Sequence, residues 1–436
     1  MRIVVAAAGS RGDVQPCVAL GLGLKGAGHK VTLASWEPYR RMAEGRGLTF
    51  YPLAGPTPEA LMAALVGAGR NPLKYARRFR PLLRPHVEGG LRDCLAACAD
   101  ADAVIYTPLG FAGFMAAEHL GLPSVGSMVE PLFVRSDAYP SAVLGRPVGL
   151  PALGGLYNRL SHPAVEVLYW RIIEPLVSDA REKMGLPPMP ALRSPVAEIH
   201  RRRRPLLLGW SRHVLPPGPR AEDRMPTTGY WFLDHEPAWE PPEKLGEFLE
   251  DGEPPIALGL GSMTGVEAAE TDRIVSETAE ALRRTGLRGV LLSGNADVDG
   301  PLPENVMRVP GEVPYDWLFP RVAAVVHHGG AGTVAAALRA GVPSVVVPVL
   351  PDQAFWAHRV SSLGAAPPPI PQRNLTAQRL SRAILGAVTD PQTRRRCEAL
   401  GTRIAAENGV ERAVEAFERM AGHTPDRGPY DVSTGR

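Results

Sequence analysis

The chain has 436 residues, of which 45% are hydrophobic and 21% charged, and its formal net charge is +3. This length exceeds what a single hydrophobic core usually supports, so two domains are expected. The composition is typical of a globular protein, and the near-neutral charge gives no reason to expect a nucleic acid partner. The longest apolar runs, such as 342–350, are roughly half as long as a membrane-spanning helix requires.

The N-terminal sequence MRIVVAAAGSRGD lacks the apolar stretch of a secretory signal, so we expect a cytoplasmic protein. Four cysteines have neither metal-ligand spacing nor matching His pairs and are interpreted as reduced structural thiols: Cys17, Cys94, Cys98 and Cys397. One basic cluster, 201–204, is interpreted as a solvated edge, with contact to an anionic membrane or an acidic partner as the alternative.

The first half of the chain alternates β-branched runs with helical patterns. The expected strands are 3–8, 31–34, 104–107 and 124–128, and the helices between them are 15–27, 37–44 and 111–120. This alternation indicates right-handed βαβ units around a parallel sheet. Two longer helical segments, 57–99 and 154–184, exceed what a crossover needs and are candidates for building a pocket.

Residues 216–254 are rich in Pro, Glu and Trp and are expected to form a semi-rigid linker without a secondary-structure element. The strand-helix alternation restarts at Ile256. We therefore predict an α/β protein of two doubly wound, Rossmann-like domains that face a cleft. The expected boundaries are 1–215, the linker, 255–405, and a closing helix with a frayed tail at 406–436.

The strongest motif is HHGGAGT at 327–333, which follows an apolar strand and opens a helix. Its glycines allow the backbone to approach an anion, and the first helix amides point at that anion, so a phosphate site is predicted. The alternative is a tight turn in which His328 only caps the helix.

A second glycine loop, GLGSMTG at 259–265, also follows a strand. It approximates the dinucleotide-binding fingerprint, although its last glycine comes one residue too late. This loop supports the main alternative function, an NAD(P)-dependent oxidoreductase.

A third motif, GSRGDVQP at 9–16, lies at the carboxyl end of the first expected strand, where open α/β sheets bind ligands. Asp13 is thus expected to face the cleft. The alternative is an N-cap for a helix that starts near Val14, which Pro16 makes less favourable because it lacks an amide proton.

The fourth motif is Asp352-Gln353, after the expected strand 344–349. A carboxylate beside an amide suits neighbouring sugar hydroxyls, and an N-cap role for Asp352 is the alternative. The pairs Asp100/Asp102 and Asp297/Asp299 lack a third ligand, so no metal site is predicted.

Together these motifs resemble the nucleotide-sugar glycosyltransferases of the GT-B fold (glycosyltransferase family 1), especially the branches that act on antibiotic aglycones and sterols. The resemblance rests on GSRGDVQP (9–16), PYDWLFPRVAAVVHHGGAGT (314–333), RAGVPSVVVP (339–348) and DQAFW (352–356). It implies that the C-terminal domain holds the nucleotide sugar and that the N-terminal domain holds the acceptor.

The resemblance also implies residue roles. Asp13 would be the catalytic base, and backbone near Val313 would contact the uracil. The nucleotide-sugar site would comprise Ser10, Gly12, Ser262, Val313, His328, Gly329, Gly330, Gly332, Thr333, Asp352 and Gln353. The segments proposed to line the acceptor pocket are rich in aromatic and Met side chains, so the acceptor is expected to be apolar and to contact Phe111, Met128 and Phe133.

Two positions depart from the family pattern. Many relatives have a ribose-binding Glu near the position of Ala336, so the choice between a UDP-sugar and a TDP-sugar stays open. Relatives that use a His at the position of Asp13 orient it with an Asp after a later strand, but here that strand ends with Thr107. A carboxylate base needs no partner to fix a tautomer, so the two differences agree.

The expected reaction is inverting transfer of a hexose, with glucose favoured, to a hydroxyl of a hydrophobic acceptor such as a sterol, terpenoid, macrolide or other natural-product aglycone. No cofactor or metal is expected, because the glycine-loop amides and His328 can stabilise the diphosphate. A non-catalytic nucleotide-sugar-binding protein remains a third possibility. The expected partners are the nucleotide sugar and a small acceptor, with only peripheral membrane contact as an option.

Overall fold

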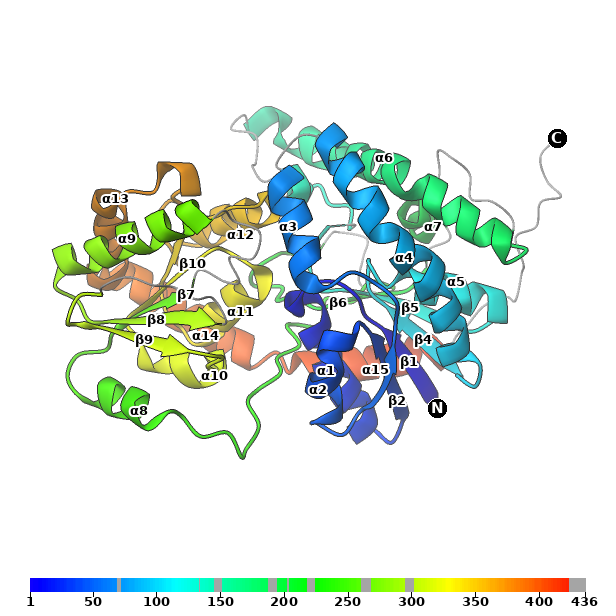
Figure 1. Cartoon of the computed structure of the whole chain (residues 1–436), viewed down its shortest axis with the longest axis horizontal. Helices are drawn as coiled ribbons and strands as arrows, with labels where there is room; N and C mark the ends of the chain where they lie inside the picture. The colour runs from blue at the N-terminus through cyan, green and yellow to red at the C-terminus, as the bar shows by residue number, and fades with distance from the viewer. Residues whose placement is uncertain are drawn as a thin grey trace. The chain divides into compact units, whose positions relative to one another are not determined.

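The computed structural model describes residues 1–68, 72–132, 134–144, 151–186, 194–201, 204–217, 224–259, 268–294 and 302–422. The chain divides into two compact units (Figure 1). The first comprises Met1–Ser141, Val148–Leu233 and Asn408–Arg436, and the second comprises Ala142–Pro147 and Asp234–Glu407. Each unit contains one parallel sheet covered by helices, so the two predicted α/β domains are confirmed.

The first sheet has the strand order β3-β2-β1-β4-β5-β6, and all its strands are parallel. The strands are β1 (Arg2–Ala6), β2 (Lys30–Ser35), β3 (Thr49–Pro52), β4 (Ala103–Tyr106), β5 (Ser124–Met128) and β6 (Leu206–Leu208). This doubly wound order reverses between β1 and β4, which is the point where such sheets bind ligands beyond the strand ends. Burial on both faces explains the continuous apolar strand sequences.

The helices of the first unit include two long ones in the segments predicted for the pocket. They are α1 (Arg11–Gly26), α2 (Arg40–Glu44), α3 (Pro58–Ala68), α4 (Pro72–Cys98), α5 (Phe111–Leu120), α6 (Pro151–Lys183), α7 (Pro195–Arg201) and α15 (Gly409–Gly422). Helix α4 packs beside α6. Arg80 Nε and Nη2 donate to the carbonyl oxygens of Ile172 (2.7 Å) and Arg171 (3.1 Å). Pro175 has no amide proton for the Arg171 carbonyl, so Arg80 supplies the donor that the helix lacks.

The second sheet has the order β11-β10-β7-β8-β9 and is also parallel. Its strands are β7 (Ile256–Gly259), β8 (Gly289–Gly294), β9 (Val306–Pro310), β10 (Ala324–His327) and β11 (Ser344–Val346). Its strand order reverses between β7 and β10, as the first sheet does between β1 and β4. Each unit therefore has its own topological switch point.

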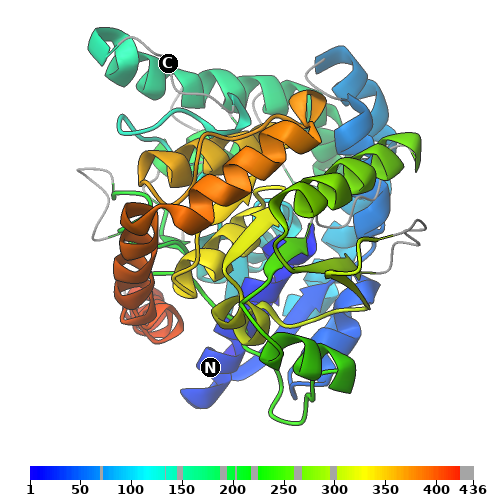
Figure 2. The ribbon, with the colours of Figure 1, turned by 90° about the vertical axis from the view of Figure 1, so that its left-hand side faces the viewer.

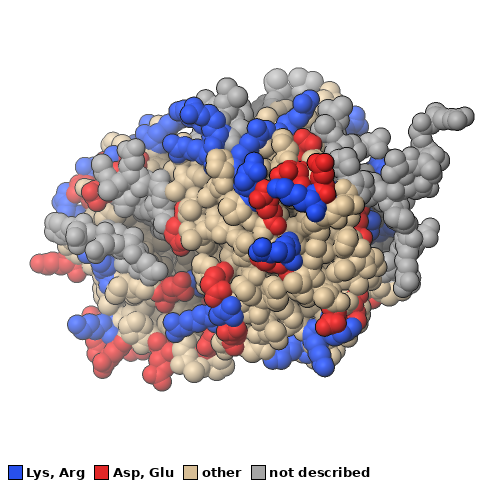
Figure 3. Space-filling view, turned by 45° about the vertical axis from the view of Figure 1, so that its right-hand side comes forward, with Lys and Arg blue, Asp and Glu red and all other residues tan. Residues whose placement is uncertain are grey.

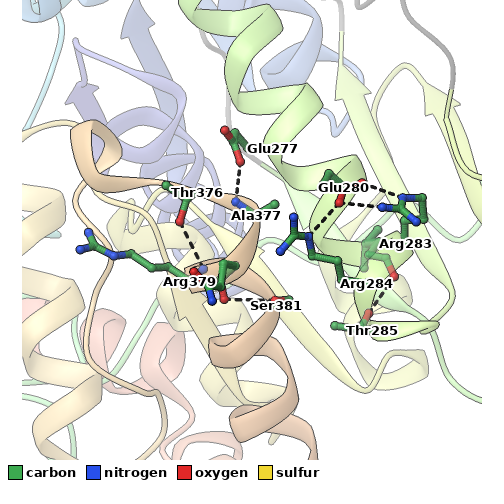
Figure 4. A network of polar contacts seen from close by, with 11 residues as sticks. Glu277, Glu280, Arg283, Arg284, Thr285, Thr376, Ala377, Arg379 and Ser381 are labelled. Carbon is green, nitrogen blue, oxygen red and sulfur yellow. Dashed lines mark hydrogen bonds and ion pairs between the residues drawn. The ribbon is translucent and has the colours of Figure 1, made fainter.

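The helices of the second unit are α8 (Glu243–Glu250), α9 (Ala268–Thr285), α10 (Tyr315–Leu318), α11 (Ala331–Arg339), α12 (Pro351–Ser362), α13 (Ala377–Thr389) and α14 (Pro391–Ala405). Helices α9 and α13 lie side by side (Figure 2). The Glu277 carboxylate accepts a hydrogen bond from the Ala377 amide, and the Thr376 hydroxyl caps α13 by accepting from the Arg379 amide (Figure 4). A side chain of α9 thus fixes the start of α13.

The predicted linker, 216–254, differs from expectation because it contains α8. Leu245 of α8 is fully buried in the second core, where the partly buried Phe248 and Leu249 also pack. These three apolar residues lie three and four positions apart, which is a helical pattern. The prolines on both sides give the segment the composition of a linker, so the sequence did not predict a helix there. The chain passes from the first unit to the second between Leu233 and Asp234, inside the predicted linker.

The segment after this crossing is held to the second unit by polar contacts. Asp234 forms a two-pronged ion pair with Arg339 of α11. His235 Nδ1 lies 2.5 Å from Asp316 Oδ2 of α10. Burial alone would raise the pKa of Asp316, but the hydrogen bonds from the backbone and side chain of His235 outweigh it, so this pKa is lowered. This part of the predicted linker therefore packs as a fixed part of the second unit.

The last described helix, α15, belongs to the first unit, not to the second. Val410 and Val414 lie against Gly23 of α1, and His29 Nε2 lies 3.0 Å from Glu418 Oε1. Asn408, just before this helix, has φ +50°, a left-handed conformation that Asn tolerates better than most residues. The predicted frayed tail, 423–436, lies outside the described residues.

All four cysteines are buried and none forms a disulfide, as predicted. Of the basic cluster 201–204, Arg202 and Arg203 lie outside the described residues. Within the described part of the chain, no helix is both long and apolar enough to span a membrane.

Candidate active site

In the first unit, Asp13 lies in the first turn of α1, directly after the switch-point strand β1. The helix begins at Arg11 with Ser10 as its N-cap, so the alternative that Asp13 is the N-cap is wrong. Asp13 occupies the third helical position, and its Oδ2 accepts hydrogen bonds from the Ser10 amide (2.7 Å) and the Ser10 hydroxyl (2.8 Å). This is the returning half of a capping box, which holds the carboxylate at the sheet edge.

Gly9 makes room for this carboxylate. It has φ +132°, and a Cβ built on it would overlap Asp13 Oδ2. The Tyr39 hydroxyl donates to the Gly9 carbonyl at 3.0 Å and fixes the turn from the other side. The glycine of the GSRGD motif is therefore required by the position of Asp13 as well as by its own backbone conformation.

Burial raises the pKa of Asp13, while the side-chain and backbone hydrogen bonds from Ser10 act in the opposite direction. Both of these hydrogen bonds end on Oδ2. Among the described residues, Oδ1 is therefore the oxygen left for a substrate proton. A carboxylate with a raised pKa is a stronger general base than an ordinary one at the same geometry.

Two residues that were not predicted as site residues, Thr107 and His86, lie at this edge of the first sheet. The Thr107 hydroxyl lies 3.2 Å from the Ala8 amide and 3.1 Å from the Gly110 amide, and it accepts a hydrogen bond from each. It ties the end of β4 to the end of β1. Its position directly after a strand is the signal that could have identified it.

His86 of α4 is a second missed residue. Burial lowers its pKa, and its Nε2 lies 2.7 Å from the Leu109 carbonyl while Trp36 Nε1 donates to its Nδ1 at 3.2 Å. A neutral ring with the proton on Nε2 satisfies these two contacts, and Nδ1 also lies 3.1 Å from the carbonyl oxygen of Ala54, after β3. Phe111, predicted to contact the acceptor, is half-buried and meets the same ring edge-on. His86 thus positions three loops that follow strands.

The other predicted acceptor residues have different outcomes. Met128 is 2% exposed, so its side chain belongs to the core of the first unit. Phe133 lies outside the described residues. The loop after it is held against α6, where Arg135 forms hydrogen bonds of 3.0 and 2.6 Å with the buried Glu166. His162 Nε2 lies 3.0 Å from the Tyr139 carbonyl of the same loop.

In the second unit, the glycine-histidine motif joins β10 to α11 as predicted. Gly330 is the N-cap, and no side chain among the described residues caps the helix. The amides of Ala331, Gly332 and Thr333 therefore lie ahead of the first intrahelical bond, which runs from Val334 to Gly330. Gly332 is exposed, whereas Thr333 is buried. Uncapped amides at a positive helix end form a site for an anion.

His328 lies beside Gly259 at the end of the neighbouring strand β7 and hydrogen-bonds to its backbone. Burial lowers the pKa of His328 to about 4, so the ring is neutral at pH 7. The preceding His327 is buried, its pKa is lowered to about 3 by burial, and its Nδ1 accepts from the Gly329 amide at 3.1 Å. His328 can therefore contribute a neutral N–H donor, or a full charge once an anion raises its pKa.

The Asp352-Gln353 pair adjoins the same loop. Gly329 has φ +95°, and a Cβ on it would lie 2.9 Å from the Gln353 carbonyl oxygen. Gln353 Oε1 accepts from the amides of Val349 (2.9 Å) and Leu350 (3.0 Å). Leu350 is the N-cap of α12, so the N-cap alternative for Asp352 is wrong. Gln353 combines a structural role through Oε1 with an Nε2 donor.

Two predicted nucleotide contacts are less defined. Ser262 lies outside the described residues, as does most of the 259–265 loop. Val313 follows β9, and its side chain is 7% exposed in the second hydrophobic core. Ala336, the position at which the resemblance implied a ribose-binding Glu in many relatives, is partly buried against the same core. Ser10 and Gly12, also predicted at the nucleotide, lie in the first unit at the start of α1.

Two family models match the chain. The model of the glycosyltransferase family 28 N-terminal domain matches residues 3–136, and that of the C-terminal domain of erythromycin biosynthesis protein CIII-like proteins matches 291–420. An O-mycaminosyltylonolide 6-deoxyallosyltransferase from Streptomyces fradiae is 37% identical over 438 residues, covering 98% of this chain and 100% of that protein. The chain belongs to the antibiotic and sterol glycosyltransferases.

This glycosyltransferase has further relatives. A sterol 3-beta-glucosyltransferase from Pichia angusta is 33% identical over 427 residues, which are 95% of this chain but only 33% of that longer protein. The glycotransferase of kitacinnamycin superposes with TM-score 0.70 at 23% identity, covering 96% of this chain and 99% of its own. The Streptomyces sp. glycosyltransferase SsfS6, solved with thymidine diphosphate, gives TM-score 0.61 at 20% identity, covering 96% and 99%. The GT-B fold expected from the sequence is thereby confirmed.

The His328→Ala variant should bind a free nucleoside diphosphate about 1–3 kcal/mol more weakly, the size of a lost hydrogen bond to a charged group. An anion raises the pKa of His328 above its free value of about 4, so its contribution should grow as the pH falls through the pKa of the complex. Calorimetric titration of the wild type and of the His328→Ala variant from pH 8 to pH 5.5 measures this difference. Because the diphosphate is protonated to the same extent in both experiments, its own titration cancels in the comparison. Equal affinities at every pH would place the phosphates elsewhere.

Proposed function

We propose that this glycosyltransferase transfers a hexose from a nucleoside diphosphate sugar to a hydroxyl of a hydrophobic acceptor, with inversion at the anomeric carbon. The observation that carries the proposal is the placement of complementary groups at the two switch points. A buried carboxylate, Asp13, follows β1 in one unit. An uncapped helix N-terminus with a buried neutral His328 follows β10 in the other.

In the proposed reaction, Asp13 Oδ1 accepts the proton of the acceptor hydroxyl while the acceptor oxygen forms a bond to the anomeric carbon. The bond from that carbon to the diphosphate oxygen breaks on the opposite face, and the electron pair leaves with the nucleoside diphosphate. The growing negative charge is stabilised by the amides of Gly332 and Thr333 and by His328. Proton transfer to a positioned base contributes a factor on the order of 10²–10⁴.

The sugar would be held by Asp352 and Gln353, and the nucleobase by backbone near Val313. Strand β9, which precedes Val313, lies two strands from β7, whose last residue contacts His328. Two strand spacings are about 10 Å, which suits the span between a diphosphate and its nucleobase. The named relatives transfer different sugars, a 6-deoxyallosyl group in one case and a glucosyl group in another. For this chain we therefore propose glucose as the transferred sugar and either UDP or TDP as the nucleotide that carries it.

Sterols, macrolides and related aglycones are the proposed acceptors, because the named relatives act on tylonolide-type and sterol compounds. The buried, unpaired thiols fit a reducing compartment and support the proposed cytoplasmic location. The test is turnover of UDP-glucose and TDP-glucose with a library of hydrophobic alcohols, with products identified by mass spectrometry and the anomeric configuration by NMR coupling. A product that retains the donor configuration would overturn the inverting mechanism.

Transfer should continue in excess EDTA, because the proposed anion site consists of backbone amides and His328. Within the described residues, no three His, Cys, Asp or Glu side chains lie together as metal ligands. Rates measured before and after chelation, with Mg²⁺ and Mn²⁺ added back, check this expectation. Loss of turnover in EDTA that either ion restores would contradict it.

A further inference from the structure

Helix α6 presents a stripe of large apolar side chains to the surface. Leu156, Leu160, Val167 and Leu168 are 52%, 55%, 44% and 46% exposed, respectively. Leu160 follows Leu156 by four residues, and Val167 and Leu168 follow Leu160 by seven and eight, which places all four on one helix face that extends for about 18 Å. The opposite face of α6 is buried and holds the 134–141 loop. We call these four residues the α6 stripe.

The charges beside the α6 stripe are cationic. Arg159 and Arg171 of α6 are exposed, and the only acidic residue of α6 before Glu174 is Glu166, which is buried and paired with Arg135. Figure 3 shows several Lys and Arg side chains in its upper part, the level at which Figure 1 places α4 and α6, with a group of Asp and Glu side chains among them. Between Leu156 and Leu168, the described residues of α6 therefore include no exposed acid, and Glu174 is the next acid along the same face.

Helix α4 extends the cationic border. Its side chains from position 72 to 87 include Lys74, Arg77, Arg78, Arg80 and Arg84 and no acid. Arg80 contacts the α6 backbone at Arg171 and Ile172, which places this part of α4 alongside the stripe. Arg77, one turn before Arg80, is exposed and forms no ion pair with another described residue, whereas the guanidinium of Arg78 lies over Gly67 of α3.

We propose that the α6 stripe and the arginines beside it dock this enzyme on an anionic lipid bilayer surface. Leucines on one helix face can enter the boundary between headgroups and acyl chains, and neighbouring arginines can pair with lipid phosphates. A second copy of the chain fits less well. In a two-fold interface the cationic border of one copy faces that of the other, and like charges repel.

The test is sedimentation of the full chain with sucrose-loaded vesicles of phosphatidylcholine alone or with 30% phosphatidylglycerol. The wild type should bind the anionic vesicles at low salt and be released at 0.5 M NaCl. Replacing Arg77 by Gln should lower the partition coefficient about fivefold. Leu160→Glu combined with Leu168→Glu should lower it by about tenfold or more.

The matched control is Leu385→Glu, a similar change at a leucine that is 40% exposed on α13 in the other unit, and it should bind vesicles like the wild type. Thermal unfolding and diphosphate affinity of all variants check that they are folded. Wild-type indifference to anionic lipid would overturn the proposal, as would full binding by the doubly substituted leucine variant. Sedimentation velocity adds one more test: a wild-type dimer that the leucine substitutions dissociate would identify the stripe as a self-interface instead.

Discussion

Replacing Asp13 by Asn should lower kcat/KM for sugar transfer by about 10²- to 10⁴-fold and change the affinity for free UDP or TDP by less than about threefold. The substitution removes the proposed proton acceptor and leaves the glycine-histidine loop of the second unit unchanged. Stopped assays of transfer and calorimetric titration of the nucleotide measure the two effects separately. Near-normal turnover would reduce Asp13 to a helix-capping residue.

The Asn side chain keeps an oxygen that can accept from the Ser10 amide, so the variant should unfold near the wild-type temperature. Ser10→Ala provides a complementary test. It removes the side-chain hydrogen bond that lowers the pKa of Asp13, so that pKa should rise further. Since the carboxylate is the active form, the acid limb of the pH profile of kcat/KM should move to higher pH. An unmoved acid limb would assign that limb to another group.

Replacing Asp352 and Gln353 together by Ala should lower transfer far more than it lowers affinity for a free nucleoside diphosphate. Each sugar hydroxyl left unpaired should cost about 1–3 kcal/mol of transition-state stabilisation. These contacts exist only when the hexose is bound. The comparison needs kcat/KM for the sugar donor and the dissociation constant for the free diphosphate.

Gln353 also caps the turn before α12, so the double variant should lose some stability. Gln353→Glu is the matched control, because its carboxylate can still accept from the amides of Val349 and Leu350 but has no N–H for a hydroxyl. It should stay as stable as the wild type while losing transfer and the discrimination between glucose and galactose donors. Equal losses for the diphosphate and the sugar donor in the double variant would mean that the pair serves only the fold.

The sequence predicted the second-unit loop well because its information is local. An apolar strand, three glycines and a helix are consecutive from Ala324 to Arg339, and the structure places them in that order. The Asp13 and Gln353 positions were predicted, but their local roles were not. Both lie at the third position of a helix, where the side chain bonds back to backbone ahead of the helix, whereas the alternatives drawn from the sequence were N-cap roles for Asp13 and Asp352.

Other features depend on contacts between distant residues. His86 joins Trp36 to Leu109, and no short motif marks a group that is defined by three separate loops. Met128 was predicted to face an acceptor because Met is common in pockets, yet burial in the core gives the same composition. Helix α8 was missed because prolines on both sides gave its segment the composition of a linker.

The return of α15 to the first unit determines how these enzymes could be recombined. The second unit is an internal segment, 234–407, because the chain enters it after Leu233 and leaves it before Asn408. Exchanging the second unit between relatives therefore requires a cassette with two junctions, and a single fusion point after 233 would separate α15 from α1. Gly409 packs against the backbone of Gly229 and Tyr230, so both junctions lie near one spot on the first unit. A chimera that keeps residues 408–422 from the same parent as 1–233 would preserve this packing.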